Sequence, residues 1–255
     1  MKWRVAAVSD VGNTRLNNED MVLVGERVFR DDRVQGAIEL PADRPYAVAI
    51  ADGMGGANAG EIASELVLEQ LRQGLATLKA GLDDEGLAKE VQTLCLDIHG
   101  RVVAEGLADS RKVGMGATLV ALLHYQTRVF FLAAGDSRLY RYRGGTLMQI
   151  SKDHSLREAL GSADVPGNIV LNSFGGGSTF SVDVGRAARR VLVEDVFLLT
   201  SDGLSDVVPE AEIETILAAS DPEVGLLAAA LNRGSQDNIS YALVEVLAVD
   251  EDGGP

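Results

Sequence analysis

The chain has 255 residues, of which 46% are hydrophobic, and 38 Asp and Glu against 23 Lys and Arg give it a formal net charge of −15. This composition allows one sizeable core. No apolar run approaches the roughly 20 residues of a membrane-spanning helix, and the first ten residues carry no long apolar region, so we expect a cytoplasmic protein without membrane insertion. The negative charge argues against nucleic acid as a partner, because a polyanion would be repelled.

Short runs rich in β-branched residues, bounded by Gly, Asp or Asn, predict strands along most of the chain. These runs are Arg4–Ser9, Met21–Val24, Tyr46–Ala51, Thr118–His124, Val129–Ala134, Leu139–Arg143, Val191–Thr200 and Ile239–Val246. The pair Gly144-Gly145 suits a two-residue hairpin turn after the sixth run.

Apolar residues at helical spacing predict helices that cluster apart from the strands. The predicted helices are Ala59–Leu78, Glu85–Val103, Leu156–Leu160, Pro209–Ala219 and Pro222–Asn232. This order favours an α+β fold with antiparallel sheets packed against helix pairs. No repeat or long linker divides the chain, so we expect one domain over residues 1–248 and an acidic flexible tail at 249–255.

The sulfur and imidazole groups do not indicate a zinc or redox site. Cys95 is the single cysteine, and it lies in an apolar helical pattern, which predicts a buried structural thiol. The three histidines, His99, His124 and His154, are scattered and show no ligand spacing.

Four acidic motifs stand where predicted strands begin or end. They are Asn18-Glu19-Asp20, Asp52-Gly53-Met54-Gly55-Gly56, Ser201-Asp202-Gly203 and Gln236-Asp237-Asn238. One such motif is typical of a turn. Four together offer carboxylates and a Gly carbonyl, which are the oxygen ligands that Mg²⁺ and Mn²⁺ prefer.

The motifs occur in an order that resembles the protein phosphatase 2C family over almost the whole chain, from about Arg4 to Val246. The matching set is Arg15-Leu16-Asn17-Asn18-Glu19-Asp20, Asp52-Gly53-Met54-Gly55-Gly56 with Gly60-Glu61, Gly116-Ala117-Thr118, Gly135-Asp136-Ser137-Arg138, Asp153-His154-Ser155, Ser201-Asp202-Gly203-Leu204 and Gln236-Asp237-Asn238. The resemblance implies a central β-sandwich of two antiparallel sheets flanked by helix pairs.

The resemblance also implies a centre for two divalent cations, Mn²⁺ or Mg²⁺. Asp52 would bridge the two ions, and Asp202 and Asp237 would hold one of them. Glu19 and the Gly53 carbonyl would serve the other.

Further roles follow from the same resemblance. Asp20 would bind or orient a metal-bound water as part of the metal site, and Arg15 would hold the substrate phosphate with its planar guanidinium. Asn238 is expected to brace the site. The motif at Gly135-Asp136 is expected to form a tight turn, and Ser155 to cap a short helix.

The chain departs from the family pattern at positions that bear on mechanism. Met54 and Ala57 stand where relatives carry histidine, so the usual candidates for a general acid are absent. Lys112-Val113-Gly114 stand where bacterial relatives often carry an Asp, which places a third metal site in doubt. The segment Leu156–Thr179, the flap, is shorter than usual and ends in a glycine run.

The predicted activity is metal-dependent hydrolysis of phosphoserine and phosphothreonine in proteins by an activated water. The expected partners are phosphorylated proteins and a cognate bacterial serine/threonine kinase. Two alternatives stay open: a pseudophosphatase that binds phosphoproteins as a regulator, and a broader phosphoesterase that acts on small metabolites. The intact set of Arg15, Glu19, Asp20, Asp52, Asp202 and Asp237 argues against the pseudophosphatase.

Overall fold

The computed structural model describes residues 1–55, 59–162, 165, 169–176 and 179–249. Its strands are β1 (Lys2–Asp10), β2 (Asp20–Val24), β3 (Arg27–Phe29), β4 (Arg33–Glu39), β5 (Tyr46–Met54), β6 (Gly116–Ala117), β7 (Leu119–Tyr125), β8 (Arg128–Ala134), β9 (Arg138–Arg143), β10 (Thr146–Gln149), β11 (Asp183–Arg186), β12 (Val196–Thr200) and β13 (Ile239–Ala248). Its helices are α1 (Ala59–Leu75), α2 (Asp84–Ala108), the 3₁₀ turn Ser110–Lys112, α3 (Leu156–Leu160), α4 (Asp202–Ser205), α5 (Glu210–Leu217) and α6 (Pro222–Asn232).

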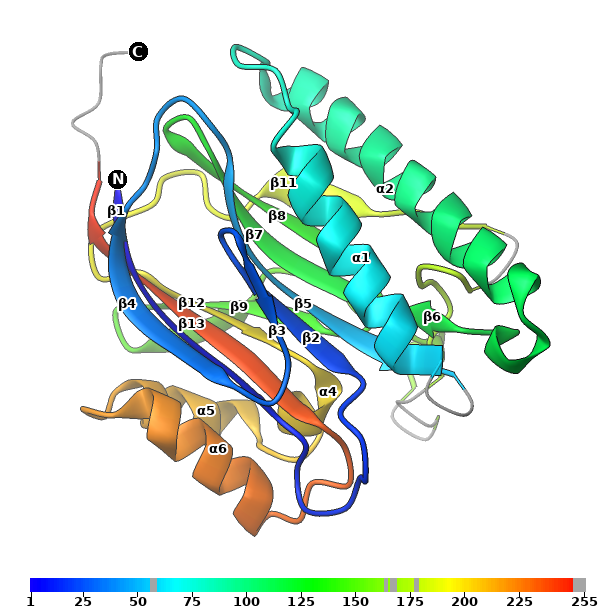
Figure 1. The fold of residues 1–255 in the computed structure, drawn as a ribbon. Coiled ribbons are helices and arrows are strands. Elements are labelled where there is room, and N and C mark those ends of the chain that lie inside the picture. The colour runs from blue at the N-terminus through cyan, green and yellow to red at the C-terminus, as the bar shows by residue number, and fades with distance from the viewer. Residues whose placement is uncertain (56–58, 163–164, 166–168, 177–178, 250–255) are drawn as a thin grey trace.

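The strands form two stacked antiparallel sheets. Over the described residues, the six-stranded sheet has the order β10-β9-β12-β13-β1-β4, and the seven-stranded sheet has the order β11-β8-β7-β5-β2-β3 with β6 paired to β5. Helices α1 and α2 cover the outer face of the seven-stranded sheet, and α5 and α6 cover that of the other (Figure 1). The prediction of an α+β fold with a β-sandwich between helix pairs is therefore confirmed.

Strand β1 shows how the pattern of residues builds these layers. Trp3, Val5 and Ala7 point into the core between the sheets, whereas Ala6 packs toward α5 and α6. Side chains of a strand alternate between its two faces, so a strand that is buried on both faces is apolar at nearly every position. The two-residue hairpin is also confirmed, since Gly144 and Gly145 have φ of 57° and 83° between β9 and β10.

The predicted boundaries need correction at several places, and the helix predicted to end at Val103 continues as α2 to Ala108. The strand predicted to begin at Val191 begins at Val196, because the chain turns at Glu194, where φ is 71°, and the Asp195 carboxylate accepts the Leu192 N–H at 2.8 Å. Helix α1 ends at Leu75 and not at Leu78. Strand β5 continues past Ala51 to Met54, because Gly53 and Met54 pair with β6.

Some elements were not predicted. Edge strand β4 carries exposed polar side chains, β3 has 3 residues, and β11 has 4 residues with a central glycine. Such short or polar segments lack the apolar alternation that identifies a strand. They are strands because a neighbouring strand in the fold offers them hydrogen bonds.

Two further expectations concern burial and the membrane. The thiol of Cys95 is buried, as predicted. Among the helices of the described residues, none combines the length and the apolar character that crossing a membrane requires. The tail residues 250–255 lie outside the described part of the chain.

Candidate metal centre

The four acidic motifs meet at one end of the sandwich, where β2 begins and β5 ends (Figure 1). Asp20 opens β2 and lies opposite Asp52 of β5 in the antiparallel ladder. Asp202 opens α4 directly after β12, and Asp237 lies two residues before β13. The sheets thus bring together carboxylates from segments far apart in the sequence.

The Asn238 amide holds two of these motifs against each other. Its Oδ1 accepts the backbone N–H of Glu19 at 2.8 Å. Its Nδ2 donates to the carbonyls of Val11 and Asn17, both at 3.0 Å. The structure therefore agrees with the bracing role expected for Asn238.

At Gly53 the backbone approaches its neighbours too closely for any side chain. A Cβ at Gly53 would lie 2.1 Å from the Gly60 carbonyl oxygen and 2.6 Å from the Glu19 carbonyl oxygen. The Gly53 N–H donates to the Glu19 carbonyl at 3.1 Å. Glycine here lets β5, the Glu19 segment and the first turn of α1 pack backbone to backbone.

The acidic side chains raise one another's pKa. Burial and then the charges of neighbouring carboxylates raise the pKa of Asp202 to about 8 and that of Asp52 well above its usual value. Burial raises the pKa of Asp20 to about 7, although hydrogen bonds from Ser201 and Ser240 oppose the rise. Burial also raises the pKa of Glu19. Without a counter-charge this end of the sandwich holds its carboxylates at a cost in free energy.

An unsatisfied oxygen fits a cation site. Asp202 Oδ1 is buried and has no hydrogen-bond partner within the described residues. A buried carboxylate oxygen without a partner is costly, and coordination by a hard divalent cation would satisfy it. The donor set, which consists of carboxylates and the Gly53 carbonyl, has the chemistry of a Mg²⁺ or Mn²⁺ site and not of a zinc site.

The side chains do not stand as a finished coordination shell. Across the described ranges, no three acidic, His or Cys side chains are gathered in an arrangement that could hold an ion as they lie. Asp237 instead pairs with Arg15, whose Nη2 donates to Asp237 Oδ2 at 2.7 Å. The predicted phosphate-binding arginine is therefore at the site, next to a predicted metal ligand.

Asp136 is a member of this cluster that the sequence analysis missed. It lies in the expected turn between β8 and β9, but its charge is the largest neighbouring contribution to the raised pKa of Asp202 and also raises that of Asp52. Burial raises its own pKa to about 6. Its position directly after a buried strand, which it shares with Asp202, was the signal available in the sequence.

The three histidines make contacts of other kinds. His99 stacks on Phe180, directly after the flap segment, with ring centroids 4.6 Å apart, and His124 lies in the core edge-to-face with Trp3. His154 Nε2 lies 3.1 Å from Asp183 Oδ2 and its Nδ1 accepts the Gly135 N–H at 3.3 Å.

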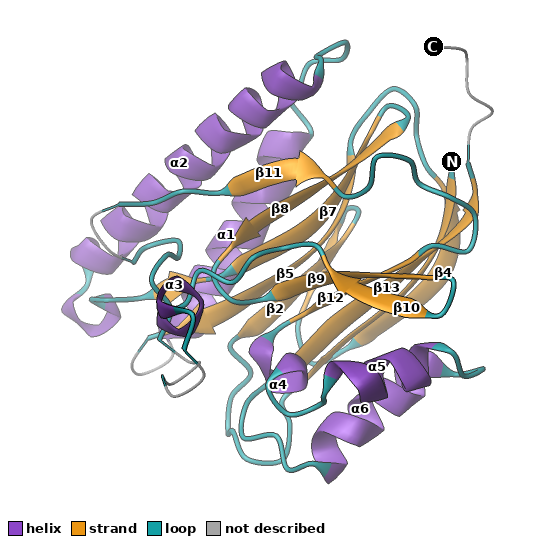
Figure 2. Ribbon diagram, turned by 180° about the vertical axis from the view of Figure 1, so that it is seen from behind, coloured by secondary structure: helices purple, strands orange, loops and turns teal. Residues whose placement is uncertain are grey.

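The flap begins with the expected short helix, α3. Ser155 caps α3 by accepting the Glu158 N–H at 3.3 Å, and Figure 2 shows α3 in the connection from β10 to β11. Ala57, the position that lacks the histidine of relatives, lies outside the described residues.

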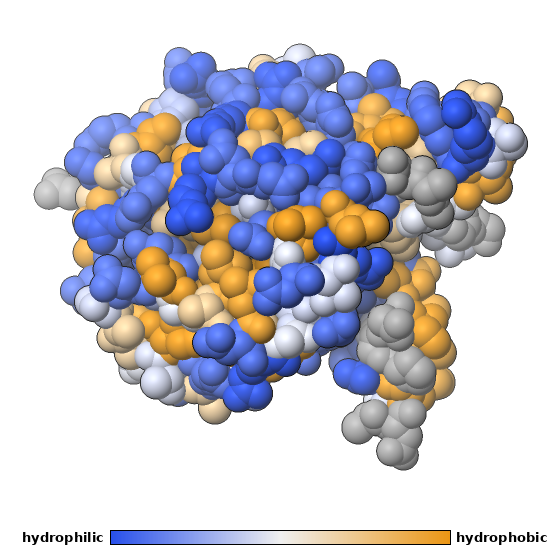
Figure 3. All heavy atoms as spheres, turned by 60° about the horizontal axis from the view of Figure 1, so that its bottom comes forward, coloured by the Kyte–Doolittle hydropathy of each residue, from blue (hydrophilic) through white to orange (hydrophobic). Residues whose placement is uncertain are grey.

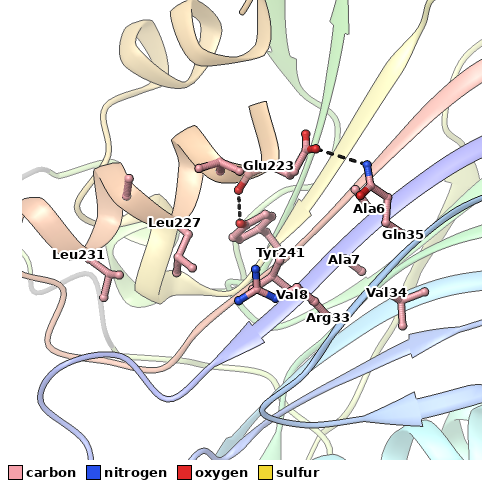
Figure 4. Close-up of a pocket in the computed structure, with 12 residues that line it drawn as sticks. Ala6, Ala7, Val8, Arg33, Val34, Gln35, Glu223, Leu227, Leu231 and Tyr241 are labelled. Atoms are coloured by element: carbon pink, nitrogen blue, oxygen red, sulfur yellow. Dashed lines mark hydrogen bonds between the residues drawn. The ribbon is translucent and has the colours of Figure 1, made fainter. Parts of the chain in front are cut away.

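A groove of about 320 Å³ lies elsewhere, between α6 and strands β1 and β4. Leu227 and Leu231 of α6 face Val8 and Val34 across it (Figure 4). On the face that carries α5 and α6, hydrophilic side chains separate the hydrophobic ones (Figure 3). The groove contains no cluster of acids or nucleophiles, so the chemistry points to the acidic end of the sandwich.

Comparisons with known proteins agree on one family. The family model described as protein phosphatase 2C matches residues 25–248. The serine/threonine phosphatase stp of Listeria innocua is 31% identical over 251 residues, which cover 93% of each protein. The structure of the S. agalactiae serine/threonine phosphatase has a TM-score of 0.81 at 28% identity and covers 96% of this chain and 99% of that one. The catalytic domain of the phosphatase PstP in complex with 2 manganese ions has a TM-score of 0.77 at 29% identity, covering 97% of this chain and 99% of that one.

Proposed function

Because this chain belongs to the protein phosphatase 2C family, we propose that it hydrolyses phosphoserine and phosphothreonine in proteins with the help of two divalent cations, Mn²⁺ or Mg²⁺. The observation that carries this proposal is the meeting of Asp20, Asp52 and Asp202, with one Asp202 oxygen buried and without a hydrogen-bond partner in the part of the chain that the structure describes. The PstP relative crystallised with 2 manganese ions supports the choice of metal.

In the proposed site Asp52, Asp202 and Asp237 would hold the cations together with Glu19 and the Gly53 carbonyl. When bound, the two cations lower the pKa of water and offset negative charge on the phosphoryl group. The Ser201 hydroxyl donates to Asp20 Oδ2 at 2.8 Å, while the Ser240 N–H donates to the same hydroxyl at 3.1 Å. These two hydrogen bonds hold the Asp20 carboxylate in a fixed orientation, in which it would orient the attacking water.

Arg15 supplies the substrate contact. Its side chain is about half exposed, at 49%, and so can reach a phosphate at the surface. A guanidinium binds two phosphoryl oxygens at once in a planar fork. Water attacks phosphorus, the bond from phosphorus to the Ser or Thr oxygen breaks, and that oxygen takes up a proton to leave as the alcohol.

The direct test is phosphate release from a phosphothreonine peptide with added Mn²⁺, repeated after exhaustive chelation. We expect turnover with the metal and none without it, because carboxylates themselves do not attack phosphorus here. Binding of the peptide without release would favour the pseudophosphatase. Faster turnover of small phosphorylated metabolites than of the peptide would favour the broader phosphoesterase.

Arg15→Ala is expected to raise KM for the phosphopeptide by about tenfold or more, the scale of losing hydrogen bonds to a charged group. The Mn²⁺ affinity should change by less than about fivefold, toward tighter binding, because a half-exposed ion pair is worth at most about 1 kcal/mol and its loss frees Asp237. Steady-state kinetics and Mn²⁺ titration measure the two effects. Arg15→Lys should recover only part of the loss, whereas weaker Mn²⁺ binding with an unchanged KM would remove Arg15 from the substrate site.

A serine/threonine kinase as the opposing partner, and a cytoplasmic location, stay predictions. The kinase follows from the function, since a protein phosphatase of this kind needs phosphorylated substrate proteins, whereas the location is expected from the lack of a long apolar run in the sequence. Neither is required by the chemistry of the site.

A further inference from the structure

Arg30 makes a set of contacts behind the acidic cluster. It directly follows β3, and its side chain is partly buried. Its Nε donates to the Asp20 carbonyl at 3.0 Å. Its Nη2 donates to the Glu61 carbonyl at 2.9 Å and lies 3.3 Å from the fully buried Ser64 hydroxyl. One guanidinium thus connects the start of β2 with the first turn of α1.

These contacts differ from those of other arginines in this acidic chain. Arg138 and Arg143, for example, pair with Asp153 and Asp195. Within the described residues Arg30 forms no ion pair and donates to neutral oxygens instead. A guanidinium offers its donors in a rigid fork, so it holds two backbone carbonyls at a set spacing, which a lysine ammonium cannot do.

Glu19 lies between the two points that Arg30 connects. On one side it is followed directly by Asp20, whose carbonyl Arg30 binds. On the other side its carboxylate lies against Gly60, where an added Cβ would be 2.8 Å from Glu19 Oε1, and Gly60 is next to the Glu61 carbonyl that Arg30 also binds. A shift of α1 away from β2 would separate Gly60 from Glu19 and from the Gly53 backbone, which both pack against it.

We propose that Arg30 is a positioning residue of the metal centre, whose guanidinium fastens the Glu19-Asp20 segment to the first turn of α1 and so holds Glu19 and the Gly53 carbonyl in place for the cation. This inference rests on the proposed metal site. Loss of Arg30 should therefore weaken cation binding, whereas charge alone predicts the opposite, because removal of a positive charge near a cation site should strengthen cation binding. The sign of the change in Mn²⁺ affinity therefore distinguishes a fastening role of Arg30 from the effect of its charge alone.

The test is calorimetric titration of the full chain with Mn²⁺ alone, for the wild type, Arg30→Gln and Arg27→Gln. We expect Arg30→Gln to bind Mn²⁺ about tenfold more weakly or worse, the scale of losing hydrogen bonds from a charged donor. At saturating Mn²⁺ its KM for a phosphopeptide should stay within about twofold of the wild type. Arg27 is the matched control, since it lies on β3, the short strand that Arg30 follows, is exposed and pairs with Asp32. Its loss should leave Mn²⁺ affinity unchanged.

Arg30→Lys keeps the charge and nearly the volume, and it decides the question if Arg30→Gln does not fold. An ammonium cannot hold both carbonyls in the same fork, so we expect Mn²⁺ binding weakened by about threefold or more. Wild-type affinity in Arg30→Lys, or tighter binding in Arg30→Gln, would overturn the fastening role while leaving the metal site intact. If the wild type itself bound no Mn²⁺, the proposed metal site and this inference would both be wrong.

Discussion

Replacing Asp52 by Asn is expected to lower turnover of a phosphothreonine peptide by at least about a hundredfold at saturating Mn²⁺. Burial raises the pKa of Asp52 most, and the charges of four neighbouring acids raise it further. These acids are Asp20, Asp202, Asp136 and Asp237. Asp52 is therefore close to the other acids of the cluster. An amide keeps the shape of the side chain but removes the negative charge that two cations would share.

The main chain at Asp52 should survive this substitution, which makes the loss interpretable. The Asp52 N–H donates to the Thr118 hydroxyl at 3.0 Å and the Asp52 carbonyl accepts the Thr118 N–H at 2.9 Å, and neither contact involves the carboxylate. The metal-free variant should even melt at a higher temperature than the wild type, because one member of a mutually repelling buried cluster becomes neutral. The opposite signs on activity and stability exclude general unfolding as the cause.

Asp97→Asn is the matched control for this experiment. Asp97 lies exposed on α2, outside the cluster, and its substitution should leave turnover and melting temperature unchanged. Near-wild-type turnover of Asp52→Asn at saturating Mn²⁺ would contradict the assignment of Asp52 as the bridging ligand.

The metal-free protein is expected to lose stability as pH rises from about 4 to about 8. An aspartate in the unfolded chain has a pKa of about 3.9, whereas burial raises the pKa of Asp20 to about 7 and that of Asp202 to about 8 in the folded chain. Over this range the unfolded state therefore binds fewer protons than the folded state, so the free energy of unfolding falls as pH rises. The contribution is fully present below about pH 4 and is lost once the folded-state pKa values are passed.

Mn²⁺ should reverse this loss, since a cation offsets the charges that the carboxylates acquire. At pH 8 we expect saturating Mn²⁺ to raise the melting temperature by about 5 °C or more, a shift of roughly 2 kcal/mol for a chain of this size. At pH 5 the rise should be smaller, because protons compete for the same oxygens.

Melting curves at several pH values, with and without Mn²⁺, measure both effects. Asp202→Asn provides the internal comparison, because removal of one raised carboxyl should flatten the metal-free pH dependence between about pH 4 and 8. A metal-free protein that is more stable at pH 8 than at pH 5 would contradict the account of mutually repelling buried acids.

The residues available for chemistry and the positions of most elements could be predicted from local patterns in the chain. Strands such as Tyr46–Ala51 and helices such as Pro222–Asn232 could be predicted because their apolar pattern repeats over neighbouring positions. The acidic motifs could be recognised because each is contiguous in the chain. Patterns of this kind can be recognised from neighbouring residues, without knowledge of the fold.

The contacts of these residues could not be predicted in this way, because they depend on how the chain folds in three dimensions. Asn238 binds the Glu19 backbone across 219 positions, and Arg30 binds Glu61 across 31, and no local pattern encodes either contact. The same holds for Asp136, which sequence analysis placed in a turn and the fold places beside Asp202. The edge strand β4 also depends on its neighbour β1, since most of its own residues are exposed. The physical reason is common to all of them: burial, charge and hydrogen bonding at these positions come from segments that are distant in the chain and meet only when the two sheets pack.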